Sequence, residues 1–385
     1  MTSTDVVVVG GGIAGTAMAY YLARSGIEVM LVERGELNRE ASGTNAGSFH
    51  LQLAIHQLSG QGTGTDRERL LAEARLSLLA YAGWQSLGDE LGGDLEVHQT
   101  GGWMVAETET ELRILYEKQV LEERAGIETE VVTGDDLRER APYLAPHLTG
   151  ATYCPWEGHA NPLVVAPLYA RRAAEKGAVI RTHTDVLGID VHGSSGARRF
   201  TVHTSAGPID AHRIVDCAGA WAGQLASMVG LRFPVRSEGL HVNVTEPRPR
   251  MFHPMIQHIG RRLTLKQTDN NTFIIGGGWP TPTSAGRYPT SWHSAAGNTA
   301  VAVSVVPGLA DVRVVRTWSG VIVFTGDFSP IVGESVAVPG FHACVSSTGF
   351  TFSPMFAEQL AEQMANPQAV SPFPERYSLD RLEST

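Results

Sequence analysis

Hydrophobic and polar positions near the start of the chain follow two different periods in turn. Val6–Val9 is an unbroken β-branched run, which predicts a strand buried on both faces of a parallel sheet. Ile13–Ser25 then carries apolar residues at helical spacing and is followed by Gly26, which predicts a helix and its end. Val29–Val32 supplies a second short strand that ends at Glu33. The pattern therefore predicts a βαβ unit.

Periodicity and capping residues predict further elements. Helices are expected over Arg67–Leu91, Glu109–Ala125, Thr133–Arg140 with a capped start, Asn161–Lys176, and from Trp221 to Gly230. Strands are expected over Val179–Thr182, Val186–Val191, Arg199–Thr204 and Ile209–Asp216. The long segment Phe233–Phe324 is mostly alternating and strand-like, so it predicts a separate sheet.

The C-terminal part resembles the first unit in its pattern. Gly340–Val345 predicts a buried strand, and a glycine turn then leads into a helix over Pro354–Met364. From Ser371 onward we expect a surface tail, because Pro372 and Pro374 oppose a regular element. A chain of 41.3 kDa exceeds what one core usually supports, so two interwoven domains are expected.

Composition and charge exclude several classes of function. With 43% hydrophobic and 18% charged residues the chain is globular, and a formal net charge of −10 argues against a nucleic-acid partner. Val6–Ala23 is uncharged, but its glycines predict a strand, turn and helix rather than a transmembrane segment. Three cysteines without CxxC spacing, and no HExxH, predict neither disulfides nor a metal site. A reducing cytoplasm is the expected location.

The turn of the βαβ unit carries a dinucleotide fingerprint. Gly10-x-Gly12-x-x-Gly15 allows a tight bend, a close approach of the pyrophosphate and close packing of helix on strand. Glu33 stands where an acid accepts from a ribose hydroxyl, and its charge disfavours a 2′-phosphate. The fingerprint occurs once, so one dinucleotide is expected. Small residues follow over Ala41–Gly47, which suggests backbone packed closely against a flat ligand.

Six blocks in order resemble the FAD-dependent D-amino acid oxidase superfamily, nearest to its glycine oxidase, sarcosine oxidase β-subunit, D-hydroxyproline dehydrogenase and opine dehydrogenase branch. The blocks are Val6–Gly15 with Glu33, Ala41–Gly47, Gly158–Pro162, Ile214–Trp221, Arg316–Gly320 and Ser347–Pro354. The resemblance implies an α/β fold with a Rossmann-like FAD-binding domain of the glutathione-reductase type and an inserted sheet-based substrate domain. It places the FAD domain at residues 1–90, 151–222 and 317–370, the substrate domain at 91–150 and 223–316, and the tail at 371–385.

The resemblance also implies which residues bind FAD. The ADP half is assigned to Gly10, Gly12, Ile13, Ala14, Gly15, Glu33 and Arg34, with the backbone of Val186 at the adenine. The pyrophosphate and isoalloxazine are assigned to Ser42, Gly43, Thr44, Asn45, Ala46 and Gly47. Gly219 and Trp221 are assigned to the diphosphate and ribityl region, and Gly320, Ser347, Thr348, Gly349, Phe350 and Thr351 to the flavin end.

Two departures from the family shape the expected chemistry. Some sarcosine oxidases attach FAD through a cysteine after the block matching Arg316–Gly320, but Val321–Asp327 contains none, so noncovalent FAD is expected. Those oxidases also use a lysine near the flavin for oxygen activation, on the strand matching Phe273–Gly276, which has no lysine. Lys266 lies on the preceding strand and is not expected to substitute for it. A dehydrogenase is therefore favoured over an oxidase.

The implied reaction is oxidation of a C–N bond beside a carboxylate, with hydride transfer to the flavin and an imine product. Such a substrate needs a cation for its carboxylate, preferably a bidentate arginine. Arg262 and Arg316 are the main candidates, with Arg261 and Arg236 as alternatives. His50 follows the stretch of small residues, and His241 begins a strand of the substrate domain, so both are candidates for substrate or flavin contacts.

Electrons must leave the reduced flavin. Three cysteines cannot supply the four thiolates of an ordinary iron–sulfur cluster, so a partner subunit or a quinone is the expected acceptor. Two alternatives stay open: a self-sufficient glycine- or sarcosine-type oxidase that produces hydrogen peroxide, and an FAD-binding subunit without turnover. The residues do not identify the substrate.

Overall fold

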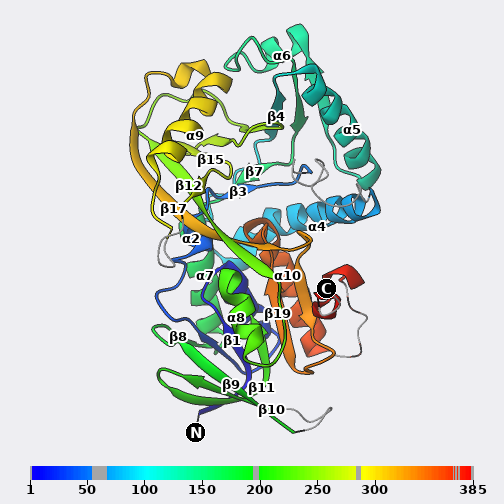
Figure 1. Ribbon diagram of the computed structural model, residues 1–385, viewed down its shortest axis with the longest axis vertical. Helices are drawn as coiled ribbons and strands as arrows, with labels where there is room; N and C mark the ends of the chain where they lie inside the picture. Colours follow the sequence, from blue (N-terminus) through cyan, green and yellow to red (C-terminus); the bar gives the residue numbers. More distant parts are fainter. Residues whose placement is uncertain are drawn as a thin grey trace.

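The computed structural model describes residues 2–53, 67–193, 199–282, 288–366, 368, 371 and 373–382. Two large sheets form the framework, one above the other along the longest axis of the molecule (Figure 1). A small sheet of β3 (Ser48–Phe49) and β7 (Gly158–His159) lies in the region between them (Figure 1).

The lower sheet is the predicted dinucleotide-binding sheet. Its main path runs β18 (Ile331–Glu334), β19 (Phe341–Val345), β11 (Gly207–Asp216), β1 (Thr2–Val9), β2 (Val29–Val32) and β8 (Val179–Arg181). The strands from β19 to β8 are parallel, and β18 is antiparallel at one edge. β9 (Val186–His192) and β10 (Arg199–Thr204) form an antiparallel extension of β11. Asp216 stands opposite Val9, so these two strands end at the same edge of the sheet.

Helices cover both faces of this sheet, which explains the unbroken hydrophobic run in β1. α1 (Ile13–Arg24), α7 (Pro162–Glu175) and α10 (Gly349–Ala365) share one core with Val6 and Val8. η1 (Gly219–Trp221) and α8 (Ala222–Ser227) lie on the opposite side, and α8 packs into a second core with Val7 and Val9. α7 begins as predicted, since the Asn161 side chain accepts from Leu163 N at 2.9 Å.

The upper sheet has nine strands. Its path runs β16 (Pro280–Thr281), β12 (Val235–Thr245), β15 (Phe273–Gly276), β14 (Thr264–Gln267), β13 (Met255–His258), β4 (Gly102–Ala106), β6 (Gly150–Cys154) and β5 (Glu130–Thr133), with β17 (Val314–Thr325) also paired to β12. The helices of this half are α5 (Glu109–Ala125), α6 (Gly134–Arg140), α9 (Trp292–Val305) and η2 (Pro307–Leu309). The long β12 and β17 run from this sheet towards the lower one, and α4 (Arg67–Leu91) crosses between the two halves (Figure 1).

One helix contradicts the sequence-based prediction. Residues 292–305 fall in the segment predicted to be strand-like, but they form α9. The sequence alternates Ala and Val near its end, which imitates a strand period. The buried stripe of the helix also includes a polar residue, Asn298, whose amide bonds Asn243 and the Gly276 carbonyl and so is satisfied inside the protein. Because Asn298 is polar, it interrupts the apolar spacing by which a helix is identified in the sequence.

Further boundaries differ from the predictions. α10 begins at Gly349 and includes Pro354 in its second turn, whereas the sequence predicts a helix that begins at the proline. The Thr133 side chain makes no cap hydrogen bond to α6. Strands β6 and β17 belong to the upper sheet, although the resemblance assigns residues 151–154 and 317–325 to the FAD domain. The division into domains by residue range otherwise stays a prediction.

The predicted surface tail is wrong for the C-terminal residues that the structure describes. Two short 3-10 helices, η3 (Glu375–Tyr377) and η4 (Leu379–Leu382), form here, and such turns tolerate the neighbouring Pro374. Tyr377 is fully buried and its ring meets Phe356 of α10 edge-on at 6.3 Å. The tail therefore packs on the lower core, while Pro372 and residues 383–385 lie outside the described residues.

Candidate functional site

The predicted glycine turn joins β1 to α1 at the carboxyl edge of the lower sheet. Gly10 has φ +115°, and a Cβ on it would lie 2.5 Å from the Cys217 carbonyl oxygen. A Cβ on Gly15 would overlap the Gly10 carbonyl oxygen, so this residue permits the close helix–strand packing. Gly12 is the N-cap of α1 and has no side chain that could cap the helix. In the part of the chain that the structure describes, Ala14 N and Gly15 N have no protein acceptor, so both face outward as donors for an anion.

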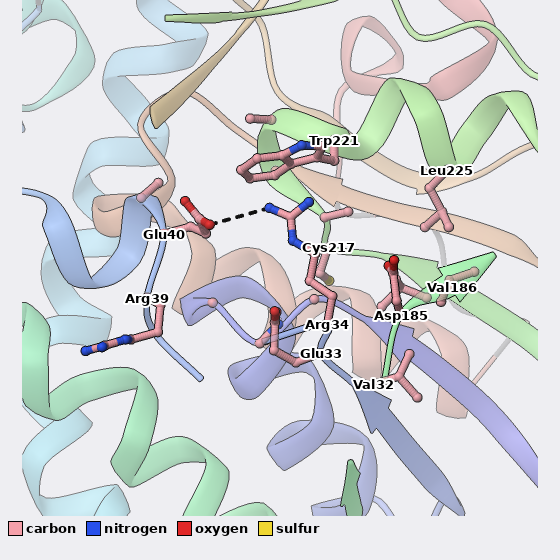
Figure 2. Close-up of a pocket in the computed structure, with 18 of the residues that line it drawn as sticks. Val32, Glu33, Arg34, Arg39, Glu40, Asp185, Val186, Cys217, Trp221 and Leu225 are labelled. Carbon is pink, nitrogen blue, oxygen red and sulfur yellow. Dashed lines mark hydrogen bonds and ion pairs between the residues drawn. The ribbon is translucent and has the colours of Figure 1, made fainter. Parts of the chain in front are cut away.

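A cavity opens in front of this turn (Figure 2). It encloses about 940 Å³, part of it open to solvent, and it reaches from Gly10–Gly12 to Val186 and Trp221. The Arg34 guanidinium lies 3.7 Å from the centre of the Trp221 ring, and its Nη2 pairs with Glu40 at 3.4 Å. Figure 2 shows the Arg34 guanidinium between Trp221 and Glu40, and Ala41 and Ser42 at the start of α2 (Ala41–Thr44) also line the cavity. The cavity has the lining that an ADP group requires: a glycine cradle, outward N–H donors and a plane for stacking.

Two carboxyl groups stand at the carboxyl ends of the strands next to this cavity. Glu33 directly follows β2, and its oxygens accept from Gly11 N at 2.7 Å and Gly35 N at 2.8 Å, which fixes the carboxylate beside the glycine turn. Its contact with a ribose stays a prediction. Asp216 ends β11 and is fully buried, and burial raises its pKa to about 8 although Ala218 N donates to it.

The stretch of small residues has a different explanation from the predicted one. A Cβ on Gly43 would overlap the Asn38 carbonyl oxygen, and one on Gly47 would overlap the Ala160 carbonyl oxygen. A Cβ on Gly320 would overlap Thr44 Oγ1. Protein packed against protein thus requires these glycines. The stretch still leads from the cavity, which Ala41 and Ser42 line, towards His50.

The first turn of α10 lies at the other end of this stretch. Thr351 Oγ1 accepts from His50 N at 3.3 Å, and Phe350 stacks on Phe49 with ring centres 6.0 Å apart. Ser346 Oγ accepts from Thr348 N at 3.2 Å and shapes the turn before the helix. The first N–H groups of this helix, from Gly349 on, therefore open beside His50 at the place predicted for the flavin end. Ser347 lies in the same turn.

Lys266, which the sequence does not favour for a role at the flavin, lies against the stretch of small residues. Its Nζ lies 3.0 Å from the position of a Cβ on Gly47. Lys266 stands directly opposite Ile274 in the β14–β15 pair, so both side chains project from the same face of the sheet. It is 2% exposed, and burial lowers its pKa to about 7. The register of two paired strands, which the sequence does not reveal, brings this amine to the site.

The candidate arginines differ in their contacts. Arg261 pairs with Glu107 at 2.8 Å, Arg236 pairs with Glu238, and Arg262 donates to the Gly278 carbonyl at 2.8 Å. Arg316 has no hydrogen bond or ion pair to any residue within the described ranges. Its guanidinium lies 5.8 Å from the centre of the Trp318 ring, whose Nε1 donates to Thr44 O at 2.8 Å. Arg316 is thus the candidate that is both exposed and connected to the predicted flavin stretch.

The two candidate histidines also differ. His241 is 1% exposed, its Nε2 accepts from Ser291 N at 3.3 Å, and Thr317 Oγ1 lies 3.1 Å from Nδ1, so its contacts are those of a packing residue. Its catalytic role stays a prediction without geometric support. His50 is partly exposed, and its Nδ1 lies 2.9 Å from Gln257 Oε1. Burial and the nearby Lys266 charge lower the His50 pKa.

Three further features concern the cysteines, metal binding and membrane-spanning helices. Cys154, Cys217 and Cys344 are all buried and unpaired. The described residues contain no cluster of histidine, cysteine and carboxylate side chains able to hold a metal ion. Among the helices described, none is long and apolar enough to cross a membrane. The cytoplasmic location predicted from the cysteines stays a prediction.

Several residues around the site are not among those predicted from the sequence. Arg39 lines the cavity, while Glu157 and Gln257 contact the His50 region from buried positions. Glu157 directly precedes the Gly158–Pro162 block, so its position beside that block could have identified it from the sequence. Nothing in the sequence around Gln257 marks it.

Comparison with known proteins agrees with this geometry. The family model described as DAO, FAD-dependent oxidoreductase, matches residues 5–363. The chain is 28% identical over 373 residues to the B subunit of opine oxidase from Rhizobium meliloti, with 95% of this chain and 94% of that protein covered. It is 28% identical over 397 residues to the beta subunit of sarcosine oxidase from an Arthrobacter species, with 99% and 92% covered.

A solved structure shows the same fold. The L-proline dehydrogenase from P. horikoshii superimposes with a TM-score of 0.87 at 22% identity, covering 100% of this chain and 98% of that one. The extent of both chains in this match indicates a shared architecture from the glycine turn to the C-terminal 3-10 helices.

Proposed function

Because the chain belongs to the DAO family of FAD-dependent oxidoreductases, we propose that it oxidises the C–N bond of an amino acid, or of a secondary amine that carries a carboxylate. One observation carries the proposal. The starts of α1 and α10, each with free backbone N–H groups, stand at the two ends of the stretch from Ala41 to His50. An extended dinucleotide with a flavin at its far end matches this arrangement.

When bound, FAD would supply the acceptor for a hydride from the carbon next to the substrate nitrogen, with an imine as the product. The residues of this chain bind and orient the reactants. Gly10–Gly15 and Glu33 hold the ADP half, and the first turn of α10 offers N–H dipoles where reduction adds negative charge. Noncovalent FAD is supported by the buried position of all three cysteines and by the absence of cysteine in Val321–Asp327.

Two side chains have proposed roles toward the substrate. Arg316 binds the substrate carboxylate, because its guanidinium is exposed, unpaired among the described residues and adjacent to Trp318. His50 stands at the flavin end and meets the substrate nitrogen. Arg262 is a weaker candidate, since its guanidinium already bonds a backbone carbonyl.

The relatives suggest how electrons leave. The opine oxidase and sarcosine oxidase relatives are each named as one subunit of a larger enzyme. A dehydrogenase that passes electrons to a partner subunit or a quinone is therefore the first candidate.

A self-sufficient oxidase is the second candidate, and Lys266 favours it. A buried cation beside the flavin end stabilises negative charge on oxygen as it is reduced, because the low-dielectric site strengthens the interaction. The two candidates are separated by assaying the purified chain alone with oxygen and with a dye. Peroxide formed at the rate of dye reduction, and lost in Lys266→Met, supports the oxidase. Dye reduction without peroxide supports the dehydrogenase.

The whole proposal is tested by anaerobic flavin bleaching. The purified FAD-loaded chain is mixed with glycine, N-methylglycine, D- and L-proline, D-hydroxyproline and an opine, and the yellow absorption is followed. Bleaching by one member and detection of its imine or hydrolysed imine support the proposal. Bound FAD that none of them bleaches contradicts it and supports a non-catalytic FAD-binding subunit. Heat denaturation that fails to release the FAD contradicts the noncovalent assignment.

A further inference from the structure

A buried polar network connects Lys118 to His50, and the Lys118 ammonium orients the hydrogen bonds along it. It begins at Lys118 on α5, which is completely buried. Its Nζ donates to Glu122 Oε2 at 2.8 Å and to Gln52 Oε1 at 2.7 Å. An ammonium group has donors and no acceptor, so the Gln52 oxygen must face Lys118.

The orientation of Gln52 fixes the next bond. With its oxygen towards Lys118, its Nε2 donates to Glu157 Oε2 at 2.7 Å. The buried Glu157 carboxyl also accepts from Leu51 N at 3.2 Å and from Gln52 N at 3.1 Å. Burial raises the pKa of Glu157, but three partners whose donor role does not depend on Gln257, namely Leu51 N, Gln52 N and Gln52 Nε2, are all N–H groups. The ionised carboxylate accepts from all three groups, and beside an ionised Glu157 the Gln257 amide must present its Nε2 as a donor.

Gln257 on β13 links the Glu157 carboxyl group to His50 by hydrogen bonds. Its Nε2 donates to both oxygens of Glu157, at 3.1 and 3.0 Å. Its Oε1 is therefore the atom that faces His50 Nδ1 at 2.9 Å. An amide oxygen only accepts, so the imidazole must carry hydrogen on Nδ1.

The opposite nitrogen of the ring is left free. His50 Nε2 has no partner within the described ranges, and the residue is partly exposed while Gln257 and Glu157 are buried. Two charged groups act on the ring: Lys266 on β14 and, through Gln257, Glu157. Burial and the Lys266 charge favour the neutral imidazole.

We propose that Gln257, oriented by Glu157, is a positioning residue that holds His50 with its hydrogen on Nδ1, so that Nε2 is the proton acceptor for the substrate nitrogen. The inference rests on the proposed function. Nε2 takes one proton from the substrate ammonium group. The freed nitrogen lone pair forms the C=N bond as the C–H electron pair leaves as hydride, for which FAD would be the acceptor, and the resulting imidazolium keeps its Nδ1–H bond to Gln257.

Two substitutions at one position separate positioning from packing. Gln257→Met keeps the length of the side chain but removes the acceptor. Gln257→Glu keeps an oxygen that accepts from His50 whether the new carboxyl is ionised or protonated. Gln267→Met is the matched control, because Gln267 is a buried glutamine of the same sheet whose amide bonds other residues.

The first measurement does not depend on turnover. Long-range nitrogen–proton NMR correlations of the FAD-loaded protein report which ring nitrogen carries hydrogen, and the His50 signals are those lost in His50→Asn. We expect the Nδ1–H form in the wild type, Gln257→Glu and Gln267→Met, and loss of that preference in Gln257→Met. An Nε2–H ring in the wild type, or an unchanged ring in Gln257→Met, would overturn the proposal.

The second measurement is the rate of anaerobic flavin reduction by the fastest substrate of the panel. General bases contribute about 10²–10⁴-fold, so we expect Gln257→Met to reduce the rate constant about 10–100-fold with little change in substrate affinity. Gln257→Glu should restore most of the rate. A wild-type rate in folded Gln257→Met would refute the role. If no substrate bleaches the wild-type flavin, the proposed function fails while the NMR result still decides the tautomer.

Discussion

Two buried lysines provide a paired test of how this protein carries charge in its interior. Lys266 has no hydrogen-bond or ion-pair partner within the described residues, whereas Lys118 bonds Glu122, Gln52 and Thr152. We predict that Lys266→Met stabilises the protein at neutral pH and that Lys118→Met destabilises it. The reason is that the first substitution removes an uncompensated ammonium and the second leaves the Glu122 carboxylate uncompensated.

The magnitude follows from the pKa of Lys266, which burial lowers from the ordinary 10.5 to about 7. This difference corresponds to about 4–5 kcal/mol of penalty at low pH. Between these two pH values Lys266 binds more protons in the unfolded chain than in the folded one, so its contribution to the free energy of unfolding rises with pH. The slope reaches about 1.4 kcal/mol per pH unit, and the penalty is gone above pH 10.5.

The assay is urea unfolding of wild type and Lys266→Met with excess FAD at pH 6, 8 and 10. The advantage of Lys266→Met should be several kcal/mol at pH 6 and should shrink as the pH rises. Lys118→Met should lose about 3–5 kcal/mol at pH 6 and 8. An advantage of Lys266→Met that is constant with pH, or a loss of stability at pH 6, would refute the interpretation of Lys266 as an unpaired buried amine.

Two further predictions concern the substrate and the tail. Arg316→Ala should raise KM for the carboxylate substrate about 10–100-fold with a smaller change in kcat, since a charge-assisted pair contributes about 1.5–3 kcal/mol. Steady-state kinetics measure this change, and the control Arg262→Ala should change KM less than about twofold. Equal effects of the two substitutions would contradict the assignment of Arg316. Tyr377→Ala should lower the free energy of unfolding by about 3–5 kcal/mol through the cavity beside Phe356, and a denaturant midpoint equal to the wild type would show that the tail does not pack in solution.

Local signals predicted much of the lower sheet and the glycine turn. The run Val6–Val9, the spacing of Gly10 to Gly15 and the Asn161-Pro162 start of α7 are properties of neighbouring residues, and the structure shows each in place. α4 and α5 also match because their apolar stripes repeat over several turns. Such signals depend little on the rest of the chain.

Features that depend on distant contacts could not be predicted in this way. Lys266 reaches Gly47 only because β14 pairs with β15 in one register, and Arg316 differs from Arg261 only in lacking a partner across the fold. Asn298 hides the period of α9 because its partners are remote in sequence. The glycines of the 41–47 stretch were correctly singled out, but their reason is contact with other backbone segments.

Oxidation of an amine next to a carboxylate at a bound FAD is the proposed activity of this chain. The most direct test mixes the FAD-loaded chain anaerobically with a panel substrate and, separately, with the amide of the same substrate. We predict stoichiometric bleaching by the carboxylate and bleaching at least about tenfold slower by the amide, because Arg316 then has no anion to bind. Equal bleaching by both compounds, or none by any carboxylate, would contradict the claim.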